Sequence, residues 1–148
     1  MRYEAKKAGR FALHVWCVPE GASAPERLPG SPYELLVTEG NAHVTGSIIE
    51  RMEPEALREK DRELRRTGAG QEVSFRPQLK DQFGNASTAT DDALTATIQG
   101  SDQVLVQLPV KRLAGLGAYE VSYTPETCGD YSVHLLLFGV DIVESPVR

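Results

Sequence analysis

The sequence predicts an all-β protein built as an antiparallel β-sandwich. Three observations carry this prediction: apolar and polar residues alternate along many short segments, turn-forming residues separate those segments, and one strand-like passage occurs twice. Alternation with a period of two places one face of a strand in a core and the other in solvent. Many short strands separated by turns in this way are typical of sandwiches.

The repeated passage lies near the two ends of the sequence. Gly9-Arg-Phe-Ala-Leu-His-Val15 recurs as Gly129-Asp-Tyr-Ser-Val-His-Leu135, and a Ser-Pro pair follows each copy, at Ser31-Pro32 and Ser145-Pro146. The first copy carries a longer loop between its two parts. Self-similarity at this spacing indicates an array of similar domains, so we expect the sequence to be part of a longer polypeptide.

Most of the chain reads as short strands. In the first strand, Phe11 and Leu13 share one face, and the second half of the sequence continues the same alternation through turn-forming clusters such as Asp81–Asn85. The expected strands cover residues 11–17, 33–37, 43–48, 73–79, 93–98, 103–108, 119–123 and 131–137.

One segment departs from this pattern. Across residues 52–67 β-branched residues are almost absent, Pro54 suits a first helical turn, and Gly68 and Gly70 suit a helix end. Charged residues of both signs dominate and the apolar stripe is thin, which predicts a surface α-helix near residues 53–66. Such a helix is either a solvated insertion or a docking helix for another protein.

Composition excludes several classes of function. A net charge of −5 without a basic stripe disfavours nucleic acid as a partner, and no apolar run approaches the roughly 20 residues that span a bilayer. The two cysteines, Cys17 and Cys128, are too few for a disulfide scaffold, so we predict reduced thiols and a cytoplasmic location. Asn85-Ala-Ser87 is a glycosylation sequon that matters only in an extracellular protein.

The sequence contains no recognised catalytic or metal-binding pattern. No serine or cysteine lies beside a histidine in a nucleophile motif, and C-x-x-C and H-x-x-x-H spacings are absent. His14 and His134 occupy the same position of the repeated strand, which favours a structural role. We therefore predict a protein that is not an enzyme, with no cofactor, no metal and no catalytic residues.

The motifs of the second half resemble a known family. Gly117-x-Tyr-x-Val-x-Tyr-x-Pro125, Gly129-x-Tyr-x-Val-x-Leu135 and Gly139-x-x-Ile-x-x-Ser-Pro146 are similar to strands E, F and the start of G of a filamin-type immunoglobulin repeat (the filamin/ABP280 repeat family). Phe75-(x)5-Asp81-x-x-Gly84-Asn85 is similar to its strand B and the following turn. The resemblance implies an immunoglobulin-like antiparallel β-sandwich.

The resemblance also implies a domain organisation. Residues 1–40 resemble the C-terminal strands, F and G, of a preceding repeat, and residues 41–148 resemble one repeat with a helical insertion at 52–67. Pro77 lies within strand B and cannot donate to a ladder, which predicts a bulge or an edge there. Strand G is incomplete at residue 148, and the sequence leaves open whether the first hairpin packs on the second repeat.

A filamin-type repeat implies a spacer and docking module that binds partner peptides by strand addition at strand C, beside strand D. Here strand C corresponds to residues 93–98 and strand D to residues 103–108, and no charged residue defends positions 93–101 against strand addition. Thr97→Pro is then expected to abolish peptide binding without unfolding the sandwich. Alternatively, a neighbouring repeat or loop covers this edge. The implied peptide-binding residues are Leu94, Thr95, Ala96, Thr97, Ile98, Val104 and Val106.

Three settings for such a module follow from the resemblance. The first is a structural or scaffolding module of a multi-domain protein in the cytoskeleton or the cilium, such as an axonemal dynein. The second is a substrate-recruiting module of an enzyme such as a ubiquitin ligase, and the third is an adhesive cell-surface ectodomain. The expected partners are proteins, bound at the strand C and D edge or through the helix at 53–66, and neighbouring repeats of the same polypeptide.

Overall fold

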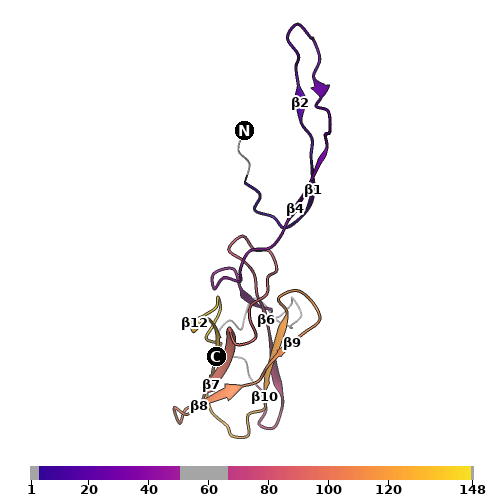
Figure 1. Cartoon of the computed structure of the whole chain (residues 1–148). Helices are drawn as coiled ribbons and strands as arrows, with labels where there is room; N and C mark the ends of the chain where they lie inside the picture. Colours follow the sequence, from indigo (N-terminus) through magenta and orange to yellow (C-terminus); the bar gives the residue numbers. More distant parts are fainter. Residues whose placement is uncertain (1–3, 51–66, 148) are drawn as a thin grey trace. The chain divides into compact units, whose positions relative to one another are not determined.

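The computed structural model describes residues 4–50 and 67–147 (Figure 1). The predicted helix at 53–66 lies outside the described residues. The chain divides into two compact units, Met1–Glu39 and Gly40–Arg148. In the described parts of both units every regular element is a β-strand and every pairing is antiparallel, as the alternation of the sequence predicts.

The first unit is a long hairpin. β1 (Gly9–Leu13) pairs with β4 (Tyr33–Val37), and β2 (Trp16–Cys17) pairs with β3 (Glu26–Arg27). The predicted strand at 11–17 is therefore two strands, interrupted at His14 and Val15.

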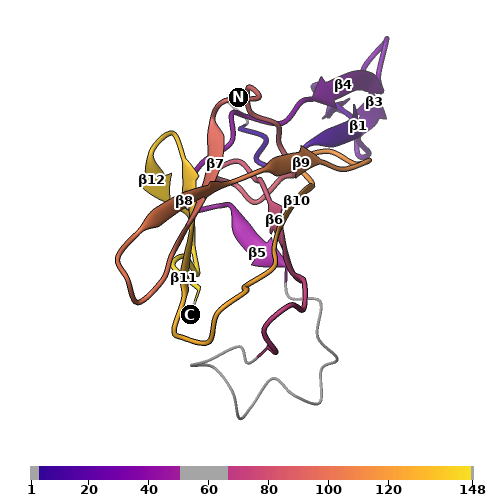
Figure 2. The same ribbon diagram turned by 90° about the horizontal axis from the view of Figure 1, so that it is seen from below.

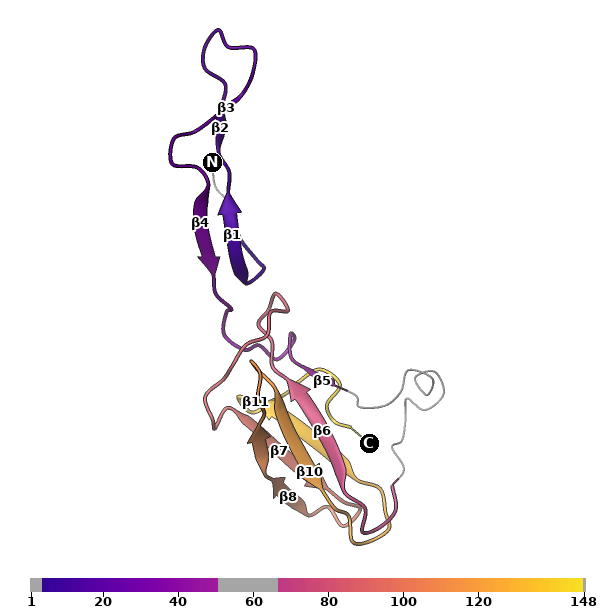
Figure 3. The ribbon, with the colours of Figure 1, turned by 90° about the vertical axis from the view of Figure 1, so that its right-hand side faces the viewer.

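The second unit is a sandwich of two four-stranded sheets (Figure 3). One sheet has the order β5-β6-β10-β9 and the other the order β12-β11-β7-β8. The strands are β5 (Ile48–Glu50), β6 (Val73–Gln78), β7 (Leu94–Gln99), β8 (Leu105–Leu108), β9 (Val110–Arg112), β10 (Tyr119–Tyr123), β11 (Ser132–Leu137) and β12 (Val140–Asp141).

The core of the sandwich is built from alternate residues of the inner strands. Val121 of β10 and Leu135 of β11 are completely buried. Ala96 of β7 is also buried, and the threonines on either side of it in the sequence are partly exposed. Each of these side chains removes apolar surface from water, which is the main favourable term in folding. The predicted all-β sandwich is confirmed, and its buried positions are those that the alternation places on one face.

Pro77 does not produce the predicted bulge or edge. β6 lies between β5 and β10, and Pro77 is fully buried opposite Ile49 of β5. The register toward β10 is unchanged on either side of it, with Phe75 opposite Val121 and Gln78 opposite Ala118. The β6–β10 pairs stop at Phe75 and resume at Gln78, so the ladder is interrupted beside the proline, which has no N–H to donate.

The first strand of the sandwich starts later than predicted. The segment predicted as a strand at 43–48 begins as a turn, in which Gly46 and Ser47 donate their backbone N–H groups to the carbonyl of His43 at 3.1 and 3.0 Å. The backbone of Gly46 lies so close to the carbonyl of Asp81 that a Cβ would be 2.1 Å from its oxygen. A residue with a Cβ would not fit there, and β5 starts after this turn, at Ile48.

The turn after β6 is organised by Asp81, which is only 1% exposed. Its carboxylate accepts hydrogen bonds from the backbone N–H groups of Gly40, Phe83 and Asn85 and from the Asn85 side-chain amide, each at 2.9 Å. Burial raises the pKa of this carboxyl, but the four hydrogen bonds outweigh burial and lower the pKa from 3.8 to about 2. Asp81 thus ties residue 40 to the turn as an ionised group.

The two copies of the repeated passage form the same hydrogen bonds. In the first unit the N–H of Val15 donates to the Ser31 hydroxyl at 2.9 Å. In the second unit the N–H of Leu135 donates to the Ser145 hydroxyl, also at 2.9 Å. These residues occupy equivalent places in the two copies, so the sequence similarity is matched in backbone geometry.

The strand register of the two copies also agrees. Leu13 lies opposite Tyr33 in the first unit, and Val133, which is equivalent to Leu13, lies opposite Val147 in the second. Their burial differs: Leu13 is 49% exposed, whereas Val133 is 4% exposed. The repeated hairpin is therefore covered by another layer in the second unit, whereas no described residue of the first unit covers its copy there.

Candidate functional site

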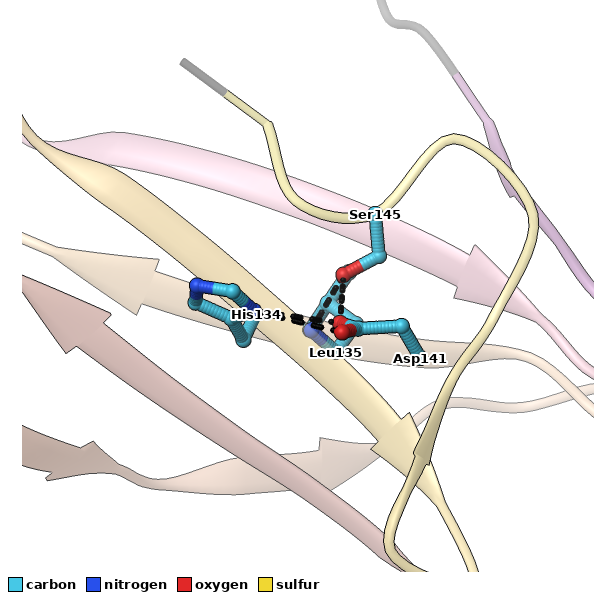
Figure 4. Close-up of polar contacts among 4 residues, drawn as sticks. All are labelled: His134, Leu135, Asp141 and Ser145. Atoms are coloured by element: carbon cyan, nitrogen blue, oxygen red, sulfur yellow. Dashed lines mark hydrogen bonds and ion pairs between the residues drawn. The ribbon is translucent and has the colours of Figure 1, made fainter.

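A histidine, an aspartate and a serine meet beside β11, but not as a nucleophile site (Figure 4). His134 Nδ1 lies 3.2 Å from Asp141 Oδ1, and the Ser145 hydroxyl donates to the same oxygen at 2.5 Å. A serine nucleophile needs the histidine as its base, with the carboxylate behind the histidine. Here the carboxylate lies between the two, so the cluster fastens the chain after β12 to β11.

The equivalent histidine of the first unit supports this structural role. His14 Nδ1 contacts the guanidinium of Arg27 at 2.8 Å, so a basic side chain stands where the second unit has Asp141. A catalytic arrangement would not survive this exchange of charge. Among the described residues there is also no group of three or more potential metal ligands.

The predicted peptide-binding strand C is β7, and it is not an edge. β7 pairs with β11 along Leu94–Gln99 and with β8 along Ala96–Gln99. Thr97, for example, lies between His134 of β11 and Gln107 of β8. Along Ala96–Gln99 both rows of its backbone groups are already paired, so this part of the strand offers no free edge, and peptide binding at the strand C and D edge stays a prediction.

The segment after β7 contains its second neighbour in the sheet. Residues 103–108 were expected to form strand D; the structure has β8 there, directly beside β7, and Pro109 separates it from β9. β9 then joins the other sheet beside β10 (Figure 2). One continuous stretch of chain therefore forms the edge of both sheets.

The accessible edge of the sandwich at this side is β8. Its one strand partner within residues 4–50 and 67–147 is β7, so alternate backbone groups face outward. Val104, Leu105 and Val106 are 55%, 63% and 45% exposed. This stretch combines free backbone groups with exposed apolar side chains, which is what strand addition requires.

The seven predicted site residues divide between these two strands. Val104 precedes the edge strand and Val106 lies in it, opposite Ile98. The other five belong to the central strand, where Leu94, Ala96 and Ile98 are core residues and Thr95 and Thr97 are partly exposed. Sequence reasoning missed Leu105. Its exposure can be anticipated only once β8 is known to be the edge strand.

A turn fixes the start of this edge. The N–H of Gln103 donates to the carbonyl of Gly100 at 3.0 Å, and the carboxylate of Asp102 accepts the N–H of Val104 at 3.1 Å. Gln103 adopts a left-handed conformation with φ of 62°. Local hydrogen bonds thus shape the turn before the edge strand, and the strand ends at Leu108, which packs in the core.

Comparison with known proteins identifies the family. The family described as "Filamin/ABP280 repeat" matches residues 51–148. The chain belongs to the filamin/ABP280 repeat family. The resemblance drawn from the sequence is confirmed, and the filamin repeat is itself a non-catalytic module.

Curated relatives of this filamin-type chain include tripartite motif-containing protein 3. The mouse protein is 32% identical over 114 residues, which cover 77% of this chain and 14% of the relative. The rat protein is 34% identical over 85 residues, which cover 57% of this chain and 11% of the relative. The chain thus spans only a small part of the relatives that it matches.

A solved structure shares the fold. The crystal structure of the Lin-41 filamin domain superposes with a TM-score of 0.54 at 18% identity, covering 73% of this chain and 93% of that one. This likeness supports the sandwich fold of the second unit. None of the described residues forms a helix long and apolar enough to cross a membrane.

Proposed function

We propose that this filamin-type repeat is a protein-recruiting module that binds an extended segment of a partner protein along β8. The observation that carries the proposal is the open edge at Leu105–Leu108, with exposed apolar side chains at Val104, Leu105 and Val106. An added strand gains main-chain hydrogen bonds from the edge, and its alternate side chains gain apolar contacts. No charged residue lies within 103–108 to oppose such pairing.

The setting supported best is the second of the three that the sequence left open, a substrate-recruiting module of a larger protein such as a ubiquitin ligase. The support is the 32% identity to tripartite motif-containing protein 3, of which this chain matches a small part. In this setting the repeat supplies recognition, and another part of the polypeptide supplies any activity.

Two features disfavour the ectodomain setting and support a cytoplasmic location. Cys17 and Cys128 are both free and exposed, which suits a reducing compartment. The side-chain amide of Asn85, the residue of the glycosylation sequon, donates to Asp81 at 2.9 Å inside a partly buried turn. An attached glycan would compete with this contact.

The proposal is tested with one edge variant and one matched control. Val106→Lys places a charge on the edge strand, where lysine opposes strand addition. Leu116→Lys places the same charge on an apolar side chain of similar exposure, 46% against 45%, in a loop away from β8. Proteins captured from cell extract by the immobilised full chain are quantified for the wild type and both variants, after melting curves show that all three are folded.

We expect one set of proteins to be retained by the wild type and Leu116→Lys and to be lost with Val106→Lys. Hydrogen exchange with a purified member of that set should then slow at 104–108. If Val106→Lys retains every protein that the control retains, β8 is not the recruiting edge.

A further inference from the structure

The hairpin of the first unit presents an apolar face. The cross-strand pairs Phe11–Leu35 and Leu13–Tyr33 place four apolar side chains together on one side of β1 and β4. They are 38%, 40%, 49% and 44% exposed in that order. A two-stranded hairpin is only marginally stable by itself, so a face of this kind is expected to pack on another layer.

The opposite face of the same hairpin is of a different character. Arg10, Ala12, Glu34 and Leu36 lie there, and each is exposed. Two of these four residues are charged, whereas all four of the first face are apolar, so the first face is the one expected to be covered.

The second unit shows what covers an equivalent face. Its Val133 is equivalent to Leu13, pairs with Val147 in the same register, and is 4% exposed. Val133 and Val147 line a pocket of about 370 Å³ together with Val73 and Phe75 of β6 and with Tyr123 of β10. The covering layer is thus the β6–β10 sheet of the sandwich.

We infer that the apolar face of the β1–β4 hairpin is a docking surface for the corresponding sheet of another filamin-type repeat, one that lacks its own last two strands. The partner is a preceding repeat of the same polypeptide, and the hairpin supplies the segments that correspond to β11 and to the residue paired with it at Val147. The shared Ser-Pro geometry and register carry this assignment. It concerns a different surface from β8 and does not depend on the proposed recruiting function.

The repeat itself defines the test. Residue 9 is equivalent to residue 129, so residues 41–128 are joined directly to Gly9 of the chain 9–148. The fused chain contains strands β5–β10 followed by the hairpin, and then the complete second unit. Hydrogen exchange is measured at residues 9–13 and 33–37 in the fused chain and in the original chain.

Docking is expected to slow exchange of the hairpin amides on the order of 1000-fold, toward the rates of a folded domain core. Leu13→Asp, on the docking face, should abolish the slowing, whereas Ala12→Asp, its neighbour on the opposite face, should retain it. Slow exchange of residues 132–137 in the same fused chain reports that the second unit is folded. Unchanged exchange of the hairpin in the fused chain, or an equal effect of the two aspartate variants, would overturn the inference.

Discussion

Replacing Ser145 with alanine should destabilise the sandwich measurably. The Ser145 hydroxyl accepts the N–H of Leu135 at 2.9 Å and donates to Asp141 at 2.5 Å. Leu135 is completely buried, so its N–H would lose its partner where water replaces it poorly. An orphaned donor of this kind costs about 1–3 kcal/mol of unfolding free energy.

That cost corresponds to a large shift in melting temperature. For a domain of roughly 100 residues, each kcal/mol lowers the melting temperature by about 4–8 °C. Ser145→Ala should therefore lower it by about 4 °C or more in calorimetry of the full chain. Ser145→Thr, which keeps the hydroxyl, should recover most of the loss.

The chain supplies its own control for this experiment. Ser31 makes the equivalent bond to Val15 in the other unit, so Ser31→Ala should leave the melting temperature of the sandwich unchanged. A loss below about 0.5 kcal/mol for Ser145→Ala, or the same shift for both serine variants, would refute the structural role given to the repeated Ser-Pro pair.

Three further outcomes follow from the structure. Thr97→Pro, in a strand paired on both sides, should cost at least about 2 kcal/mol in urea unfolding, whereas an edge position would tolerate it. The folded-state pKa of Asp81 is about 2 against 3.8 for the free group, so its contribution to stability is complete above about pH 4 and is lost as the pH falls toward 2; Asp81→Asn should flatten this part of the stability–pH curve. Gly117→Ala should lower the free energy of unfolding by about 2 kcal/mol or more beyond the effect of Gly70→Ala. Both glycines have positive φ, but of the two only Gly117 would place its new Cβ against backbone, 2.3 Å from the carbonyl oxygen of Ser87. Equal unfolding free energies for the two alanine variants would show that this close approach is wrong.

The strands of the sandwich were predictable because burial on one face leaves a direct record in the sequence. The segment 119–123 is a strand with those bounds, and its buried residues, Tyr119 and Val121, alternate with partly exposed ones. The Asp81 turn was equally visible, since its carboxylate bonds to backbone groups only a few residues away, at Phe83 and Asn85. Local chemistry of this kind needs no knowledge of the fold.

The candidate site was harder to predict because it depends on strand order. Alternation identifies Leu94–Gln99 as a strand but does not say which strand lies beside it. The chain that follows changes sheets at Pro109. As a result β8 pairs beside β7 and is itself the edge strand of that sheet. Which backbone groups are free is decided by this tertiary pairing, and the sequence carries no signal for it.

Amide hydrogen exchange of the full chain tests the account at its centre, which is the position of β7 inside the sheet and of β8 at its edge. We predict that the amides of Ala96–Gln99, which are paired on both sides, exchange only with unfolding of the sandwich, while the outward-facing amides among Leu105–Leu108 exchange far faster. Rapid exchange at alternate residues of β7, with uniform protection along β8, would contradict the strand order and the recruiting edge together.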